Sequence, residues 1–175
     1  MASILRRPFR YRYYSATIIL IVACVLVFLY GFVARGRGLL YLSLIPNYVL
    51  EAGAWWQVVT YLFVHGSWGH IFFNMLALFL FGIQLEQRMG SSEFLLYYFI
   101  CGIGAGVATV LINAATGQGD IPVVGASGAI YALLLGFAAF FPDARIFIFG
   151  ILPMRAPVAV AAYAGIEIVM SLTSL

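Results

Sequence analysis

Ser127 is the first residue whose type and surroundings could support chemistry. It lies in the stretch Gly125-Ala126-Ser127-Gly128-Ala129, where small neighbours would let another helix or a substrate backbone approach its hydroxyl. The stretch belongs to the apolar run 121–141, which is long enough to cross a bilayer as a helix, with Ser127 about six residues inside it. Small residues also line many helix interfaces in membranes, so this stretch alone favours a packing serine over a nucleophile.

A second polar cluster changes that balance. His70 and Asn74 lie four residues apart in the apolar run 68–85 and would share one helical face, whereas His65 would point elsewhere on a continuous helix. Such side chains are costly inside a span unless they face the bundle interior. The runs 68–85 and 121–141 would both enter the membrane from the outer side. His70, Asn74 and Ser127 would therefore lie at one depth in the membrane. A serine nucleophile with donors for an oxyanion is the requirement of acyl transfer.

Two other chemistries fit these residues poorly. A zinc site would need a third ligand, and His65 and His70 are out of phase on a helix. Gly117-Gln118-Gly119-Asp120 matches the Gly-x-Gly-Asp string of presenilin-like aspartyl proteases, which need two apposed carboxylates. Asp120 would lie in a loop and Asp143 at the opposite membrane face. We therefore expect no metal and no cofactor.

The composition excludes a soluble globular domain. The chain has 175 residues, of which 65% are hydrophobic and 9% charged, and its mean hydropathy is +1.06. All nine basic residues are arginines, and the net charge is +3. Four of them precede the first apolar run, which is typical of a cytoplasmic N-terminus and not of nucleic-acid binding: Arg6, Arg7, Arg10 and Arg12. We expect a multi-pass protein of a bacterial inner membrane.

The hydropathy pattern predicts an all-α membrane bundle. After a basic N-terminus at 1–14, we expect spans at about 15–34, 68–85, 94–113, 121–141 and 158–175. Residues 35–67 form an outer connection that is apolar enough to be embedded, with Trp55 and Trp56 at headgroup level. Gly102, Gly104 and Gly106 predict a close-packing face. Since the chain ends inside the last span, we expect a piece of a longer protein.

Three motifs, in this order, resemble the rhomboid family of intramembrane serine proteases. They are His65-Gly66-Ser67-x-x-His70-x-x-x-Asn74, Leu85-Glu86-x-Arg88-x-Gly90 and Gly125-Ala126-Ser127-Gly128-Ala129-x-Tyr131. The resemblance covers roughly residues 55–175. It implies a rhomboid-like bundle of six spans, with an embedded loop after the first span, a serine at the start of the fourth span and a water-filled cavity open to the outer side.

The resemblance also implies roles for single residues. Ser127 would be the nucleophile, and His70 and Asn74, with the Ser127 backbone N–H, would form the oxyanion site. Gly125 would give room there, and Tyr131 would stack against a catalytic histidine. Gly128 and His65 would support the site. The implied partners are transmembrane protein substrates, cut near the outer membrane face, and the lipid bilayer.

The chain departs from the family pattern at two places. A tryptophan-arginine pair of the first loop is Trp56-Gln57 here, which loses a charge that helps to fold that loop. The general base of the family is a histidine on the sixth span, whereas His65 and His70 match oxyanion-side positions. We therefore expect the encoded protein to be an active protease and the 175-residue fragment to be inactive. The alternative is a non-catalytic relative that binds transmembrane segments.

Overall fold

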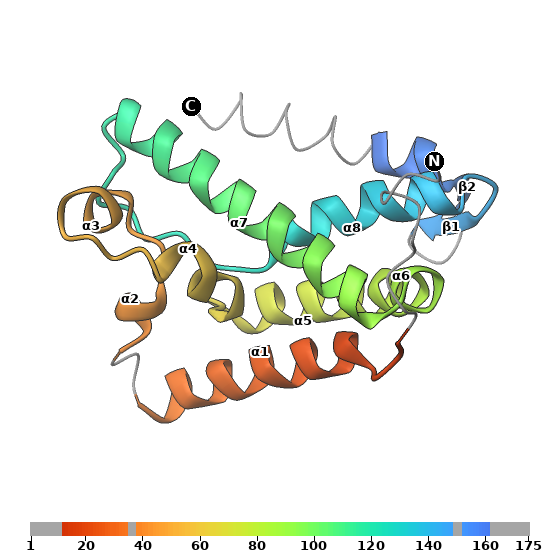
Figure 1. Ribbon diagram of the computed structural model, residues 1–175, viewed down its shortest axis with the longest axis horizontal. Coiled ribbons are helices and arrows are strands. Elements are labelled where there is room, and N and C mark those ends of the chain that lie inside the picture. The colour runs from red at the N-terminus through yellow and green to blue at the C-terminus, as the bar shows by residue number, and fades with distance from the viewer. Residues whose placement is uncertain (1–11, 35–37, 149–151, 162–175) are drawn as a thin grey trace, which may run out of the picture.

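The structure is a computed structural model that describes residues 12–34, 38–148 and 152–161. Its helices are α1 (Ala16–Val33), α2 (Leu39–Leu42), α3 (Pro46–Glu51), α4 (Gln57–Thr60), the 3-10 helix η2 (Tyr61–Phe63), α5 (Trp68–Ala77), the π-helical turn η3 (Leu78–Gly82), α6 (Ile83–Met89), α7 (Ser91–Ala115) and α8 (Ser127–Phe140). A hairpin of β1 (Arg145–Ile148) and β2 (Leu152–Arg155) follows, and residues 156–161 are again helical. The predicted all-α fold class is confirmed, with this small hairpin as an addition (Figure 1).

Three of the described helices are long and apolar enough to cross a membrane. They are α1, the continuous helix Trp68–Met89 formed by α5, η3 and α6, and α7. The predicted runs 15–34, 68–85 and 94–113 fall on these three helices. α8 is apolar but shorter, with 14 residues. Most of the predicted run 158–175, with its Glu167, lies outside the described residues.

α8 begins at Ser127, six residues after the start of the predicted run 121–141. Residues 121–126 are non-helical because Val123 pairs with Leu44 instead, with N–H···O distances of 2.8 and 2.9 Å in the two directions. Pro122 has no N–H to give a helix, and Gly125 has φ +116°, which no helix contains. A hydropathy pattern detects none of these three constraints.

The helices pack closely where α7 meets α8 and the connection before α5 (Figure 1). A Cβ atom added to Gly102 would lie 2.9 Å from Leu62, and one added to Gly106 would lie 2.9 Å from the ring of Tyr61. Gly102 and Gly106 therefore form the predicted close-packing face. Gly104 does not belong to it, because it is exposed and a Cβ there would meet nothing within 4 Å.

Glu86 ties the start of α1 to the junction of α6 and α7. Its carboxylate is fully buried and accepts hydrogen bonds from the N–H groups of Ala16 at 2.6 Å and Thr17 at 2.9 Å. The hydroxyl of Ser91 donates a third hydrogen bond to it. Ser15, the residue before α1, has φ +58° and provides no side-chain cap. Glu86 thus caps α1 from another helix, where a negative charge also suits the helix dipole.

The β1–β2 hairpin lies after the end of α8, between the predicted spans 121–141 and 158–175. Its register pairs Arg145 with Arg155 and Ile146 with Met154. Ile146 packs against the core of the bundle. The hairpin therefore rests one face on the helices and presents the other outward.

Candidate active site

Ser127 is the first residue of α8, and the segment that precedes it is held on two sides. Val123 pairs with Leu44, and the N–H of Gly125 donates to the carbonyl of Tyr61 over 2.9 Å. The first N–H groups of a helix have no intrahelical acceptor, and they carry the positive end of the helix dipole. Ser127 thus lies where a developing negative charge would be stabilised, at the helix start that the resemblance implied and not six residues inside a helix, as the apolar run suggested.

The imidazole of His70 lies directly over Gly125. A Cβ atom at Gly125 would approach the His70 Nε2 to 2.5 Å and Cε1 to 2.7 Å. His70 is positioned by the start of α5, where the Ser67 hydroxyl accepts a hydrogen bond from the His70 N–H over 3.2 Å. The room that the resemblance assigned to Gly125 is therefore the space filled by the His70 ring.

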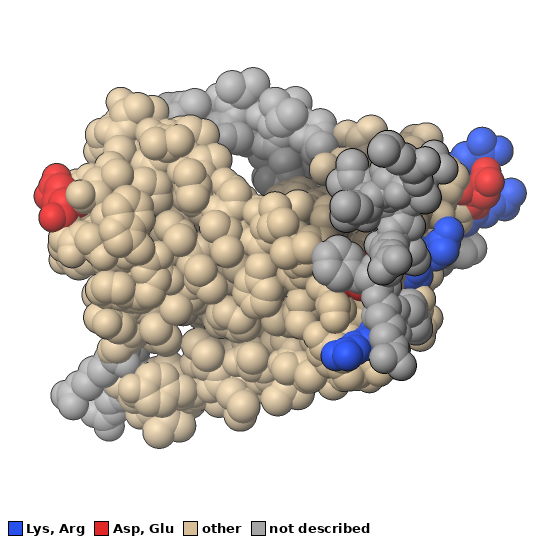
Figure 2. Space-filling view, viewed as in Figure 1, with Lys and Arg blue, Asp and Glu red and all other residues tan. Residues whose placement is uncertain are grey.

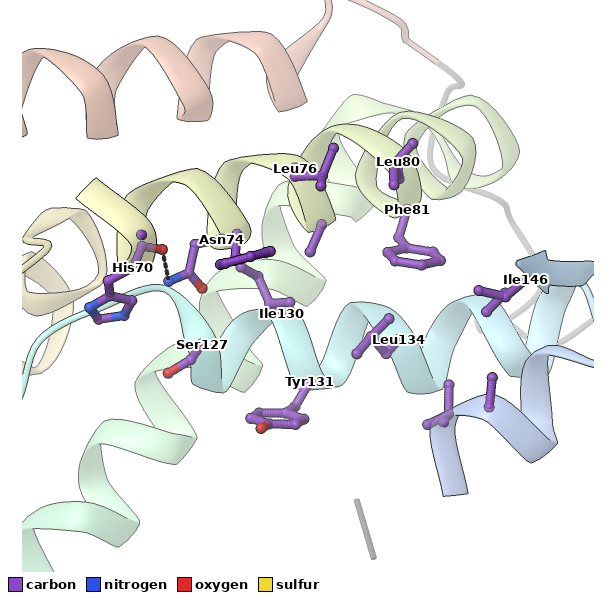
Figure 3. Close-up of a pocket in the computed structure, with 15 residues that line it drawn as sticks. His70, Asn74, Leu76, Leu80, Phe81, Ser127, Ile130, Tyr131, Leu134 and Ile146 are labelled. Carbon is purple, nitrogen blue, oxygen red and sulfur yellow. Dashed lines mark hydrogen bonds between the residues drawn. The ribbon is translucent and has the colours of Figure 1, made fainter. Parts of the chain in front are cut away.

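Asn74 lies one turn after His70 on α5, so both side chains face the same way. Its Nδ2 donates to the carbonyl of His70 over 2.9 Å, and the side chain is 7% exposed (Figure 3). This bond fixes the amide plane and uses one of the two Nδ2 hydrogens, so the second remains for another acceptor.

One cavity of about 770 Å³ brings Ser127, His70 and Asn74 together (Figure 3). Ser127 is exposed to it and His70 is half-buried. Tyr131, one turn after Ser127 on α8, also lines it. The rest of the wall is apolar and comes from α5 to η3, α8, β1 and residues 159–160: Phe73, Leu76, Leu80, Phe81, Ile130, Leu134, Ile146, Ala159 and Val160, with Gly69 and Ala77. The polar groups thus gather at one end of an apolar groove.

His65 lies outside this cavity wall but touches His70. α5 begins only at Trp68, so the two histidines are not on one helix, and their ring centroids lie 5.1 Å apart in an edge-to-face contact. The His65 Nδ1 lies 3.2 Å from the carbonyl of Phe63, while Nε2 is buried without a hydrogen-bond partner among the described residues. Burial lowers the pKa of His65 to about 4, with a smaller lowering by His70 and an opposing effect of the Phe63 carbonyl.

This pKa predicts that acid destabilises the fold. His65 stays neutral in the folded protein between pH 6.5 and 4, whereas the unfolded chain binds a proton there, so stability falls as the pH falls. The full loss is about 3 kcal/mol. Unfolding titrations in mixed micelles between pH 7 and 4 check this. His65→Asn, which cannot titrate and keeps a donor for the Phe63 carbonyl, should flatten the dependence; an unchanged slope would contradict the assignment.

Gly128 and Tyr61 support the site from behind. A Cβ at Gly128 would lie 2.6 Å from the Cβ of Ala105, so this glycine sets the contact between α8 and α7. Tyr61, which the sequence analysis did not single out, accepts the Gly125 N–H through its carbonyl and donates its hydroxyl to the carbonyl of Gly102 over 2.7 Å. The spacing of Gly102 and Gly106 was the available signal, because Gly106 makes room for the Tyr61 ring and Gly102 makes room for the neighbouring Leu62.

Gln57 replaces the charge that the resemblance led us to expect after Trp56. Its side chain is 1% exposed, and its Oε1 accepts the N–H of Ile45 over 2.9 Å. Its Nε2 and the Trp56 Nε1 both donate to the carbonyl of Tyr41, over 3.4 and 2.9 Å. A neutral amide thus ties α2 and α3 to α4, and the loss of the charge leaves this connection held together.

The Gly-x-Gly-Asp string has a structural role. The Asp120 carboxylate accepts a hydrogen bond from the Asn47 Nδ2 over 2.9 Å at the surface. Asp143 follows the other end of α8 and is exposed. The two carboxylates are therefore separated by the length of α8 and cannot share a proton.

Comparisons with known proteins agree with these features. A family model described as the Rhomboid domain matches residues 52–175. The chain is 30% identical over 118 residues to the rhomboid protease GlpG of Haemophilus influenzae. The aligned region covers 67% of this chain and 58% of that protein. It is 35% identical over 88 residues to the rhomboid protease GluP of Bacillus subtilis, covering 50% and 16%, and 32% identical over 93 residues to RHOMBOID-like protein 5 of Arabidopsis thaliana, covering 53% and 29%.

The matches thus span less than two thirds of the length of each of these relatives. The family model, however, covers most of the chain, including the segments that carry His70, Asn74 and Ser127. With its apolar helices, the chain is an integral membrane protein. It belongs to the rhomboid family of intramembrane serine proteases.

Proposed function

We propose that the protein containing this chain is a serine endopeptidase that cuts transmembrane segments of membrane proteins near the outer membrane face. The observation that carries the proposal is the convergence of Ser127, His70 and Asn74 on one cavity, with Ser127 at the start of α8. In this proposal the N-terminus is cytoplasmic, the membrane is a bacterial inner membrane, and the cavity is open to the outer side.

The chemistry follows from these positions. The Ser127 Oγ attacks the carbonyl carbon of the scissile bond, and the carbonyl π electrons move to the oxygen. The Ser127 N–H, His70 and Asn74 donate hydrogen bonds to this oxyanion. Collapse breaks the C–N bond as the leaving nitrogen takes up the proton that Ser127 lost to a general base, and water then hydrolyses the acyl-enzyme and restores the Ser127 hydroxyl. A serine hydroxyl needs a general base, which the family resemblance assigns to a histidine of a sixth span.

The cavity also limits the substrate. A helical substrate keeps its carbonyls hydrogen-bonded, so it must unwind before Ser127 can attack one of them. The apolar wall along α5 and α8 would hold the side chains of the unwound segment, while its backbone reaches the polar end. We therefore expect substrates with small or helix-breaking residues near the outer membrane face.

Labelling by a fluorophosphonate tests the proposal in the complete gene product. The probe phosphonylates an activated serine, so we expect one labelled site, at Ser127, and loss of the label in Ser127→Ala. Ser92→Ala is the matched control, because Ser92 is exposed and lies on α7 outside the cavity. A label that persists in Ser127→Ala would reject the mechanism; a folded wild-type protein without label would favour the non-catalytic relative.

Asn74→Ala should lower kcat for a cleavable transmembrane substrate by about 10²- to 10³-fold, with KM little changed, because one oxyanion donor is lost. The same substitution removes the hydrogen bond to the His70 carbonyl. Asn74→Ser keeps a short donor and should recover part of the rate. Equal kcat values for Asn74→Ala and the wild type would exclude Asn74 from the oxyanion site.

A further inference from the structure

Arg145 and Arg155 share the outward face of the β1–β2 hairpin. They are register partners at its open end. Because the Ala156 N–H donates to the Ala144 carbonyl over 2.9 Å, the Arg145–Arg155 pair is of the non-hydrogen-bonded type, in which facing side chains lie closer. The Cβ atoms of such a pair are about 4.5 to 5.5 Å apart. The two guanidinium groups therefore extend from neighbouring positions on the same face of the hairpin.

The facing arginines place two like charges side by side. Like charges that face each other across a ladder are destabilising. Both arginines are exposed, and within the described part of the chain neither forms an ion pair. Asp143, the acidic residue closest in sequence, is exposed and unpaired there as well. Two guanidinium forks on one face match the geometry of a phosphate, which would remove the repulsion.

The position of the hairpin indicates where that phosphate comes from. Figure 2 shows the described arginine side chains, with a smaller group of acidic atoms among them, at the end of the molecule that carries β1 and β2 in Figure 1. This end lies beyond the last residue of α8, opposite Ser127. An arginine-rich end of a membrane bundle faces the cytoplasm, where the leaflet is rich in anionic lipids. On the inner face of the hairpin, Ile146 contacts the core and lines the cavity.

We propose that Arg145 and Arg155 together bind the phosphate of an anionic phospholipid headgroup at the cytoplasmic boundary of the bundle. The lipid anchors the hairpin, whose opposite face closes the inner end of the cavity. The site does not depend on whether Ser127 is catalytic.

Spin-label spectroscopy tests this proposal with the full chain in phosphatidylcholine vesicles. A trace of phosphatidylglycerol or phosphatidylcholine, labelled on the acyl chain, reports the fraction of lipid that the protein immobilises. We expect the wild type to prefer phosphatidylglycerol about fivefold or more. Arg155→Glu should abolish the preference. That variant should fold, because opposite charges across the Arg145 pair stabilise the hairpin.

The control is Arg12→Gln combined with Arg88→Gln, which lowers the charge of the same end by two, as Arg155→Glu does. It should keep most of the preference. An equal loss in both variants would overturn the proposal, because the general positive potential would then suffice. The absence of a preference in the wild type would overturn it as well. Millimolar inorganic phosphate at constant ionic strength is a further arm: displacement of the labelled lipid would assign the site to free phosphate instead.

Discussion

Replacing Gly125 with alanine is expected to lower the rate of fluorophosphonate labelling by at least about 10³-fold. The new Cβ would lie 2.5 Å from the His70 Nε2, so the imidazole must leave its position. Alanine also disfavours the φ of +116° at this residue, and the backbone before Ser127 would shift. Both effects remove donors from the oxyanion site, one through a side chain and one through the Ser127 N–H.

The matched control is Gly104→Ala. Gly104 is exposed on α7, and its added Cβ would meet nothing within 4 Å, so alanine there should leave labelling unchanged and slightly favour the helix. Unfolding titrations of Gly125→Ala separate a displaced His70 from a misfolded bundle. A folded Gly125→Ala protein that labels at the wild-type rate would exclude His70 and Gly125 from the site.

Glu86→Ala is expected to destabilise the fold by about 3 to 5 kcal/mol. The carboxylate accepts three hydrogen bonds, from the Ala16 and Thr17 N–H groups and from the Ser91 hydroxyl, in a site without solvent access. Alanine would leave these donors buried and unpaired, and it would remove the negative charge from the start of α1. Unfolding of the purified protein by SDS in mixed micelles measures the difference.

Two further variants sharpen this prediction. Glu86→Gln keeps one acceptor oxygen but turns an NH₂ group toward the remaining donors, so its loss should be smaller than that of Glu86→Ala. Glu51→Gln changes an exposed carboxylate and should stay within about 0.5 kcal/mol of the wild type. If Glu86→Ala were as stable as Glu51→Gln, the cap of α1 would be of no energetic importance.

The types and spacing of the polar residues were sufficient to predict that Ser127, His70 and Asn74 meet, but not that His65 touches His70. His70 and Asn74 are four residues apart on an apolar helix, and Ser127 lies among small residues, so local patterns identify them. The position of Ser127 at the start of its helix could not be predicted from hydropathy and came only from the family resemblance. It depends on the pairing of Val123 with Leu44, a contact between distant segments that leaves no local pattern.

The same limit applies to two supporting residues. Glu86 could be recognised as part of a motif, but its acceptor role toward Ala16 depends on how α6 packs beside α1. Tyr61 is one of eleven tyrosines, and only the fold shows that its carbonyl and hydroxyl hold Gly125 and Gly102. Hydropathy identifies the helices, whereas hydrogen bonds between segments determine how the site is assembled.

The cap that Glu86 places on α1 has a consequence for biosynthesis. Glu86 follows Ala16 by 70 residues, so the ribosome makes the acceptor roughly 4 to 14 s after the helix that needs it. During that delay the leading amides of α1 must be hydrated or bound by lipid headgroups. α1 therefore enters the membrane before its first N–H groups have their final acceptor. It packs stably in the bundle only after the α6–α7 turn has left the ribosomal exit tunnel.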